Sequence, residues 1–187
     1  MADISRILIC DHQGDKLASY ITARRSDLAC RVCQAGDVRD ADLQWADTLI
    51  GFAAPVDLTT SSIRWVHSTG AGVDRLLREP WPAGVTLTRT TGKLGERIAE
   101  YCIGYALAHA QRMLAYQQDQ ICRRWDPVEP RAINDTTAVI IGTGTVGSAI
   151  ATRFGGLGCY TIGISRSGYS RPEFNQVLPA DGFTSIV

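Results

Sequence analysis

A glycine pattern that follows a short apolar run constrains the fold of this chain more than any other feature. Residues 139–150 read VIIGTGTVGSAI, which places Gly142, Gly144 and Gly147 at the spacing G-x-G-x-x-G. Glycines at this spacing suit a strand that turns tightly into a helix packed closely against it. Residues 160–165, YTIGIS, are a second candidate strand. The pattern therefore predicts a β-α-β unit of a parallel sheet.

The same unit predicts a binding site for a dinucleotide. The predicted helix begins with Thr145, Val146 and Gly147, whose N–H groups lie at the positive end of the helix dipole and suit a pyrophosphate. An NAD site usually has an acidic residue about 20 positions after the glycines, where it binds the ribose hydroxyls. No acidic residue lies between Thr136 and Pro172.

Three polar residues stand where that acid is expected, and they are Ser165, Arg166 and Ser167. An arginine at this place can pair with a ribose 2′-phosphate, and the hydroxyls can donate to the same group. We therefore predict NADP as the cofactor, with NAD as the less favoured alternative. The alternative for Arg166 is a solvated surface arginine with no role in binding.

The rest of the chain adds a second α/β region and a long helix. Short apolar segments alternate with helical ones in the first half, which predicts a compact α/β layer structure with a parallel sheet. Residues 95–120 carry apolar side chains at helical spacing, so we expect one uninterrupted helix there. No further clear strand follows residue 165. The candidate strands of the first half are 5–10, 28–34, 47–53, 63–68 and 85–90.

Composition excludes several classes of partner and cofactor. The chain has 19 basic and 19 acidic residues and no long charged run, so we expect no nucleic-acid or anionic-membrane partner. No apolar run approaches about 20 residues, and the N-terminus has no signal-peptide shape, so we expect a cytoplasmic protein. Cys30-x-x-Cys33 permits a zinc or redox site, but no second ligand pair follows. We interpret these cysteines as small apolar residues of a strand and predict no metal site.

Four stretches in this order resemble the D-isomer-specific 2-hydroxyacid dehydrogenases, most closely the glyoxylate/hydroxypyruvate reductase branch. They are WVHSTGAGVDRLL, ERIAEYCIGYALAHAQRM with the later RRWDP, VIIGTGTVGSAIATRFGGLG, and ISRS. The resemblance implies a flavodoxin-like substrate domain over residues 1–92 and the first part of a Rossmann cofactor domain over 93–187. It also implies that the helix over 95–120 helps to build a homodimer. The alternative for this helix is burial against its own sheet.

The resemblance also assigns a substrate site. It implies that the backbone N–H groups of Ala71, Gly72 and Val73 bind the carboxylate of a small 2-keto or 2-hydroxy acid, and glycine-rich loops form such anion-binding concavities. Phe52 would line the same cleft, and Asp74 would hold the loop or cap a following helix. The alternative is a plain strand-to-helix turn.

The implied activity is NADPH-dependent reduction of small 2-keto acids. In the family an arginine, a glutamate and a histidine do the chemistry, and all three lie in the second half of the cofactor domain, beyond the stretches matched here. His12, His67 and His109 do not match the catalytic position. We therefore expect no catalytic residue in this chain, interpret it as C-terminally truncated, and predict that the 187 residues alone are inactive. The alternative is a non-catalytic dinucleotide-binding or dimerisation module.

Overall fold

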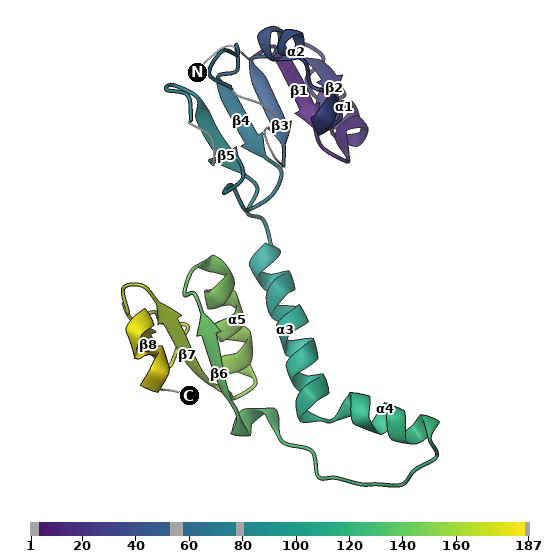
Figure 1. Ribbon diagram of the computed structural model, residues 1–187, viewed down its shortest axis with the longest axis vertical. Coiled ribbons are helices and arrows are strands. Elements are labelled where there is room, and N and C mark those ends of the chain that lie inside the picture. Colours follow the sequence, from purple (N-terminus) through teal and green to yellow (C-terminus); the bar gives the residue numbers. More distant parts are fainter. Residues whose placement is uncertain (1–3, 53–57, 78–80, 186–187) are drawn as a thin grey trace. The chain divides into compact units, whose positions relative to one another are not determined.

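The chain forms two compact units, which divide after Thr91 (Figure 1). The structure is a computed structural model that describes residues 4–52, 58–77 and 81–185. Unit 1 extends to Thr91 and unit 2 begins at Gly92. Each unit contains its own parallel sheet, so the α/β class predicted from the sequence is confirmed. No helix in the described ranges is both long and apolar enough to cross a membrane.

Unit 1 is a five-stranded parallel sheet in the order β2-β1-β3-β4-β5. This is the strand order of flavodoxin-like folds, in which the order of the strands across the sheet reverses between the first and third strands. The strands are β1 (Arg6–Cys10), β2 (Ala29–Val32), β3 (Thr48–Gly51), β4 (Trp65–Ser68) and β5 (Thr86–Arg89). The helical elements are α1 (Gly14–Thr22), η1 (Ala35–Asp37) and α2 (Asp40–Trp45).

Buried apolar side chains on both faces hold this sheet. Leu8, Leu49 and Val66 come from β1, β3 and β4, and they share a core with Leu43 of α2. On the other face α1 approaches the sheet closely at Gly14, where a Cβ atom would lie only 2.5 Å from the Cγ1 atom of Val32. Parallel strands are normally apolar on both faces for this reason. Sequence analysis did not predict the short helix α2.

Unit 2 contains a three-stranded parallel sheet in the order β6-β7-β8. The unit consists of α3 (Leu94–Ala110), α4 (Met113–Ile121), η2 (Ile133–Asp135), β6 (Thr137–Ile141), α5 (Thr145–Gly156), β7 (Tyr160–Ser165), β8 (Gln176–Pro179) and η3 (Ala180–Ser185). Helix α5 connects β6 to β7 and packs on them, with Ala151 in the same core as Ile140. Helix α3 lies beside α5 (Figure 1), and Gly95 makes this approach possible because a Cβ there would lie 3.2 Å from that of Ala149.

Strand β8 corrects the expectation that no strand follows residue 165. Residues Ile162–Ser165 of β7 pair with Gln176–Pro179 in parallel register. The side chain of Asn175 secures the entry to β8, because its Oδ1 atom accepts a hydrogen bond from the Thr161 N–H at 2.7 Å. The strand contains only two consecutive large apolar residues, Val177 and Leu178, so its sequence signal is weak.

The single helix predicted over residues 95–120 is wrong, because the structure has two helices there. Helix α3 ends at Ala110, and Arg112 adopts the left-handed conformation with φ 54° before α4 begins at Met113. A returning segment takes the place of the next helical turn. The Arg131 N–H donates to the Ala110 carbonyl at 3.0 Å, and the Gln111 side chain donates to the Arg131 carbonyl at 3.1 Å. The long-range contacts therefore satisfy a carbonyl that a continuous helix would have used.

Candidate functional site

The carboxyl ends of β1, β3 and β4 meet at one edge of the sheet in unit 1. Their last residues, Cys10, Gly51 and Ser68, are register partners in adjacent strands. The residues that follow them are Asp11, Phe52 and the loop 69–73. Ligands of open α/β sheets bind at this kind of edge, next to the point where the strand order reverses.

Three consecutive amides of the loop are free. The N–H groups of Ala71, Gly72 and Val73 have no hydrogen-bond acceptor among the residues that the structure describes. The carbonyl oxygens of the same loop do have partners, because Ser68 Oγ lies 3.0 Å from the Gly70 oxygen and Arg89 Nη1 lies 2.8 Å from the Ala71 oxygen. A run of unpaired donors beside a strand end can bind a carboxylate.

Asp11 fixes the start of this loop. Its Oδ2 atom accepts a hydrogen bond from Thr69 Oγ1 at 2.6 Å, and its Oδ1 atom accepts one from the Gln13 N–H at 2.9 Å. Burial raises the pKa of the Asp11 carboxyl. These hydrogen bonds and the nearby His12 ring lower the pKa by more than burial raises it, so the pKa is below its ordinary value. The Asp11 carboxyl is therefore ionised at neutral pH and serves as an acceptor.

Phe52 packs against the loop, whereas Asp74 forms no hydrogen bond with its described residues. The Phe52 ring lies against Gly70, where a Cβ atom would come within 2.4 Å of the ring, so a residue larger than glycine requires this ring to move. Asp74 forms no hydrogen bond in the part of the chain that the structure describes, and residues 74–77 form turns instead of a helix. The described residues therefore give no support to the expectation that Asp74 caps a helix or holds the loop, and residues 78–80, where such a helix would continue, lie outside them.

The glycine loop of unit 2 connects β6 to α5. Gly142 has φ +100°, which side chains disfavour, and its N–H donates to the Ile164 carbonyl of β7 at 2.8 Å. Gly147 packs so closely that a Cβ atom would lie 1.8 Å from the Gly142 carbonyl oxygen. Gly144 is different, because its φ of −79° suits any residue and nothing lies within 4 Å of a Cβ built there. Open space beside Gly144 leaves its backbone accessible to a ligand.

Helix α5 begins with unpaired donors. The N–H groups of Thr145, Val146 and Gly147 have no acceptor within the described ranges, and no side chain caps the helix. The first hydrogen bond along the helix runs from the Ser148 N–H to the Gly144 carbonyl at 2.8 Å. The helix start therefore combines free amides with the positive end of the helix dipole, an arrangement that binds phosphate.

Ser165, Arg166 and Ser167 lie at the same edge of this sheet as the glycine loop, because β6 and β7 run parallel with Ile141 beside Ile164. Ser165 Oγ accepts a hydrogen bond from the Gly168 N–H at 3.1 Å, which leaves its own proton free to be donated. Arg166 and Ser167 are exposed. Arg166 has no carboxylate partner within the described residues.

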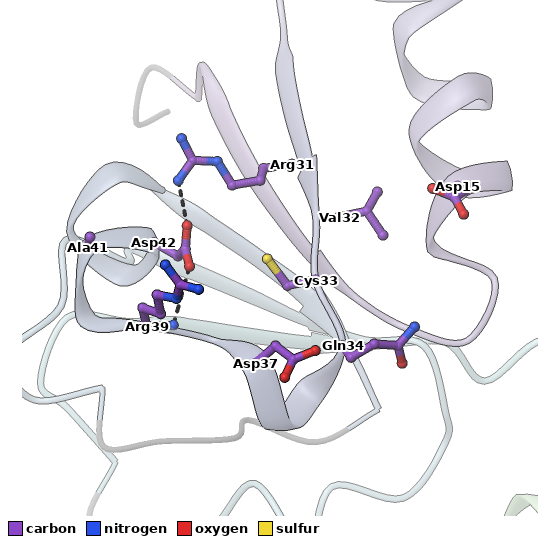
Figure 2. Close-up of a pocket in the computed structure, with 9 residues that line it drawn as sticks. All are labelled: Asp15, Arg31, Val32, Cys33, Gln34, Asp37, Arg39, Ala41 and Asp42. Atoms are coloured by element: carbon purple, nitrogen blue, oxygen red, sulfur yellow. Dashed lines mark hydrogen bonds and ion pairs between the residues drawn. The ribbon is translucent and has the colours of Figure 1, made fainter.

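Unit 1 also has a charged hollow of about 720 Å³ beside β2, which Figure 2 shows. Its three carboxylates and two guanidinium groups give no preference for a ligand of one charge, and Arg31 is already paired with Asp42 and stacked 4.2 Å from the Trp45 ring. The lining residues are Asp15, Arg31, Val32, Cys33, Gln34, Asp37, Arg39, Ala41 and Asp42.

The cysteines and histidines do not form a reactive cluster. Burial raises the pKa of both the Cys30 and the Cys33 thiol, and inert structural cysteines behave in this way. No group of three or more potential metal ligands occurs among the described residues. The ring nitrogens of His67 contact the hydroxyls of Thr88 and Thr90 at 2.8 and 3.0 Å, which fixes this ring between β4 and β5.

Four residues that shape the loop 69–73 were missed by sequence analysis. They are Asp11, Ser68, Thr69 and Arg89. Ser68 and Thr69 lie within the matched stretch WVHSTGAGVDRLL but were given no role, whereas Asp11 and Arg89 lie outside every matched stretch. The four come together only through the strand order. A polar residue directly after a buried strand, as at Asp11, is the one signal that could have suggested a role.

The fold and the glycine loop define a class of protein. Unit 2 has the strand order and the helix start of a Rossmann-type dinucleotide-binding domain. Comparison with known proteins agrees, because residues 103–184 match the family described as "D-isomer specific 2-hydroxyacid dehydrogenase, NAD binding domain". The chain is thus related to the D-isomer specific 2-hydroxyacid dehydrogenases, and the resemblance predicted from its motifs is confirmed.

Two curated relatives illustrate this relationship. The chain is 41% identical over 105 residues to "Uncharacterized protein in mprR 3'region" of Streptomyces coelicolor, which covers 56% of this chain and 38% of that relative. It is 33% identical over 130 residues to glyoxylate/hydroxypyruvate reductase A of Yersinia enterocolitica, which covers 64% of this chain and 41% of the relative. The matches thus span less than half the length of these relatives.

Solved structures share the fold over nearly the whole chain. A D-isomer specific 2-hydroxyacid dehydrogenase family protein from Aeromonas salmonicida superposes with a TM-score of 0.82 at 24% identity, covering 98% of this chain and 61% of that one. An NADPH-dependent glyoxylate/hydroxypyruvate reductase from Sinorhizobium meliloti, in complex with NADP and sulfate, gives 0.75 at 23% identity, covering 97% and 58%.

Proposed function

We propose that this chain carries the cofactor-binding and carboxylate-binding elements of an NADPH-dependent reductase of small 2-keto acids, of the glyoxylate/hydroxypyruvate type. In unit 2 the first turn of α5 would bind the pyrophosphate, and Ser165, Arg166 and Ser167 would bind the 2′-phosphate. In unit 1 the amides of residues 71–73 would bind the substrate carboxylate. In a complete reductase of this type, bound NADPH would supply the hydride for the keto carbon.

The uncapped start of α5 is the observation that carries this proposal. Its free amides follow Gly142, whose positive φ turns the chain sharply out of β6. Gly144 needs neither its conformational freedom nor its small size for any contact within the described chain. Its lack of a side chain is useful only to something that approaches from outside, and a pyrophosphate at a helix N-terminus does so.

The end of β7 supports NADP over NAD. Arg166 is exposed and not engaged by any described carboxylate, and no acidic residue lies between Thr136 and Pro172 to bind ribose hydroxyls. A guanidinium can pair with a doubly charged phosphate through two hydrogen bonds. The relatives add support, because several are named glyoxylate/hydroxypyruvate reductase A and the Sinorhizobium meliloti reductase binds NADP.

Titration of the purified protein with NADPH and with NADH tests the proposal. We expect tighter binding of NADPH, and Arg166→Ala should weaken it about tenfold while leaving NADH almost unchanged, because only a charged hydrogen bond to the 2′-phosphate is lost. Arg153→Ala is the matched control, since Arg153 is also an exposed arginine of unit 2 but lies in the last turn of α5. Equal affinity of the starting protein for NADPH and NADH would contradict the assignment.

We also infer that residues 1–187 bind the cofactor without reducing a keto acid. The stretches that resemble the family do not include its arginine, glutamate and histidine, and loss of general acid catalysis alone costs about 10²–10⁴-fold in rate. NADPH should therefore not be oxidised measurably in the presence of glyoxylate. A non-catalytic dinucleotide-binding module predicts the same result, but it needs no carboxylate site, so binding of a small carboxylate to unit 1 favours the reductase.

We further propose that the chain forms a homodimer through α3 and α4. Tyr101 and Tyr105 are each 65% exposed, Leu114 is 75% exposed and Ile121 is 69% exposed. An apolar surface of this kind commonly marks an interface. Light scattering at low micromolar concentration should give a dimer, and Leu114→Glu with Ile121→Glu should give a monomer. Tyr20→Ser, which removes an exposed ring from α1, should leave the dimer intact, and a monomeric starting protein would refute the proposal.

A further inference from the structure

In residues 69–73, which we call the carboxylate loop, three carbonyls accept hydrogen bonds from side chains, whereas the amides of residues 71–73 have no acceptor among the described residues. Ser68 Oγ lies 3.0 Å from the Gly70 carbonyl oxygen and 3.4 Å from that of Gly72, so its single proton is shared between them. Arg89 Nη1 donates to the Ala71 carbonyl between these two at 2.8 Å. Three successive carbonyls are therefore held by two side chains, whereas the amides that follow them have no acceptor among the described residues.

The peptide geometry converts this pattern into an orientation. A trans peptide unit is planar, so its N–H points away from the carbonyl of the preceding residue. All peptide bonds of the described chain are trans. When Arg89 holds the Ala71 carbonyl, the Gly72 N–H consequently points to the opposite side. Ser68 has the same effect on the N–H groups of Ala71 and Val73.

We propose that Arg89 and Ser68 are positioning residues that aim the loop amides at the substrate carboxylate, with Arg89 responsible for Gly72 and Ser68 for its two neighbours. This inference rests on the proposed function, which assigns the carboxylate to this loop. Arg89 acts through the Ala71 carbonyl and does not itself contact the substrate. It therefore differs from an arginine that pairs with the carboxylate directly.

Ser68 and Arg89, the two anchors of the loop carbonyls, lie side by side in adjacent strands. Ser68 and Arg89 are register partners, as the last residues of β4 and β5. Side chains of register partners leave a sheet on the same face, so both reach the loop that follows β4. Ser68 is fully buried, and the Thr90 N–H donates to its carbonyl at 2.9 Å, which continues the pairing beyond β5. The anchors are therefore part of the rigid sheet.

The orientation of the amides can be measured without a ligand. Residual dipolar couplings report the direction of each N–H bond in the full chain labelled with ¹⁵N. Arg89→Met should change the coupling of Gly72 while those of Ala71 and Val73 remain, because Ser68 still holds their preceding carbonyls. Ser68→Ala should produce the reverse pattern. An unchanged Gly72 coupling in Arg89→Met would overturn the proposal, even if Ser68→Ala does not fold.

Binding of oxamate, a small carboxylate that resembles a 2-keto acid, then tests whether the oriented amides bind a carboxylate. Arg89→Met should raise the oxamate Kd about tenfold through loss of one aimed donor to a charged group. The loss should persist at 0.5 M salt, whereas a purely electrostatic effect of the guanidinium would be largely screened there. Disappearance of the difference at high salt would overturn the positioning role. Arg89→Lys, which retains a donor, should recover part of the affinity.

Arg24→Met is the matched control. Arg24 is another exposed arginine of unit 1 that donates to a backbone carbonyl, that of Tyr20, but it lies beyond the end of α1. This variant has the same change in charge and should leave the loop couplings and the oxamate Kd unchanged. If the starting protein does not bind oxamate but Gly72 still reorients in Arg89→Met, the proposed function fails while the positioning role stands.

Discussion

The two units each present a row of amides without an acceptor in the described parts of the chain, but they fix those amides by different means. In unit 2 the amides belong to the first turn of α5, and close packing of Gly147 against Gly142 sets their position. In unit 1 the amides belong to a loop without regular structure, and side chains of Ser68, Arg89 and Asp11 hold it. The site in unit 2 depends on glycines, which have no side chain, and the site in unit 1 depends on the side chains of particular residues.

This difference determines which changes each site can tolerate. The site in unit 2 should withstand many changes of side chain outside its glycines, because its donors are part of a helix. The site in unit 1 should be sensitive to polar substitutions at several places, because the side chains of Ser68 and Arg89 hold three of its loop carbonyls. The two sites can therefore be tested separately. One test adds a methyl group at the glycine turn of unit 2, and the other removes a charge at the loop of unit 1.

Gly147→Ala should have the largest effect. The new Cβ atom would lie 1.8 Å from the Gly142 carbonyl oxygen, which belongs to the backbone and cannot turn aside. Helix α5 must then move away from β6, and overpacking of this severity costs about 3 kcal/mol of stability. We expect NADPH binding to be lost and unit 2 to melt at a lower temperature, as measured by circular dichroism.

Two controls sharpen this prediction. Gly155→Ala lies in the same helix with nothing within 4 Å of the new atom, and it should stabilise the helix by about 0.5–1 kcal/mol. Unit 1 should melt as before in both variants. Its tryptophans, Trp45, Trp65 and Trp81, report on it by fluorescence, whereas Trp125 of unit 2 is 92% exposed. A Gly147→Ala protein as stable as its parent would show that close packing does not fix the turn.

The same difference explains what could be predicted from the sequence. The glycine turn is built from residues 142–147, so its spacing alone predicted the strand, the turn and the helix start. Both sheets contain strongly apolar strands, and most of these were also predicted. The break between α3 and α4 was not, because the residue that bonds to the end of α3, Arg131, lies 21 positions beyond its last residue, Ala110.

The anchors of the carboxylate loop were invisible for a similar reason. Asp11 and Thr69 are separated by 58 positions, and Ala71 and Arg89 by 18, so nothing in the local pattern connects them. They meet because β1, β3, β4 and β5 lie in register at their carboxyl ends. The sequence therefore predicted which amides would bind a ligand, but only the sheet shows which side chains hold the carbonyls of this loop.

A smaller effect is expected from acid, and it should appear at one site only. The Asp11 carboxyl anchors the loop through Thr69, and hydrogen bonds together with the His12 ring bring its pKa below the ordinary value despite the opposing effect of burial. A carboxyl with a lowered pKa stabilises the folded state fully above its ordinary pKa, and this contribution disappears as the pH falls through the lowered value. The loop should therefore loosen in acid.

The measurement is a pH titration of the backbone amide resonances of Ala71, Gly72 and Val73. Asp11→Asn should weaken the loop by about 1 kcal/mol at neutral pH, because an amide replaces an ionised acceptor, and it should abolish the pH-dependent shift of these resonances. Asp27→Asn removes an exposed carboxylate of unit 1 that pairs with Arg25, away from the loop, so it should leave the titration unchanged. If the loop amides of Asp11→Asn titrate like those of the parent, a group other than this carboxyl controls the loop, and the contrast between side-chain anchors in unit 1 and glycine packing in unit 2 loses its chemical basis.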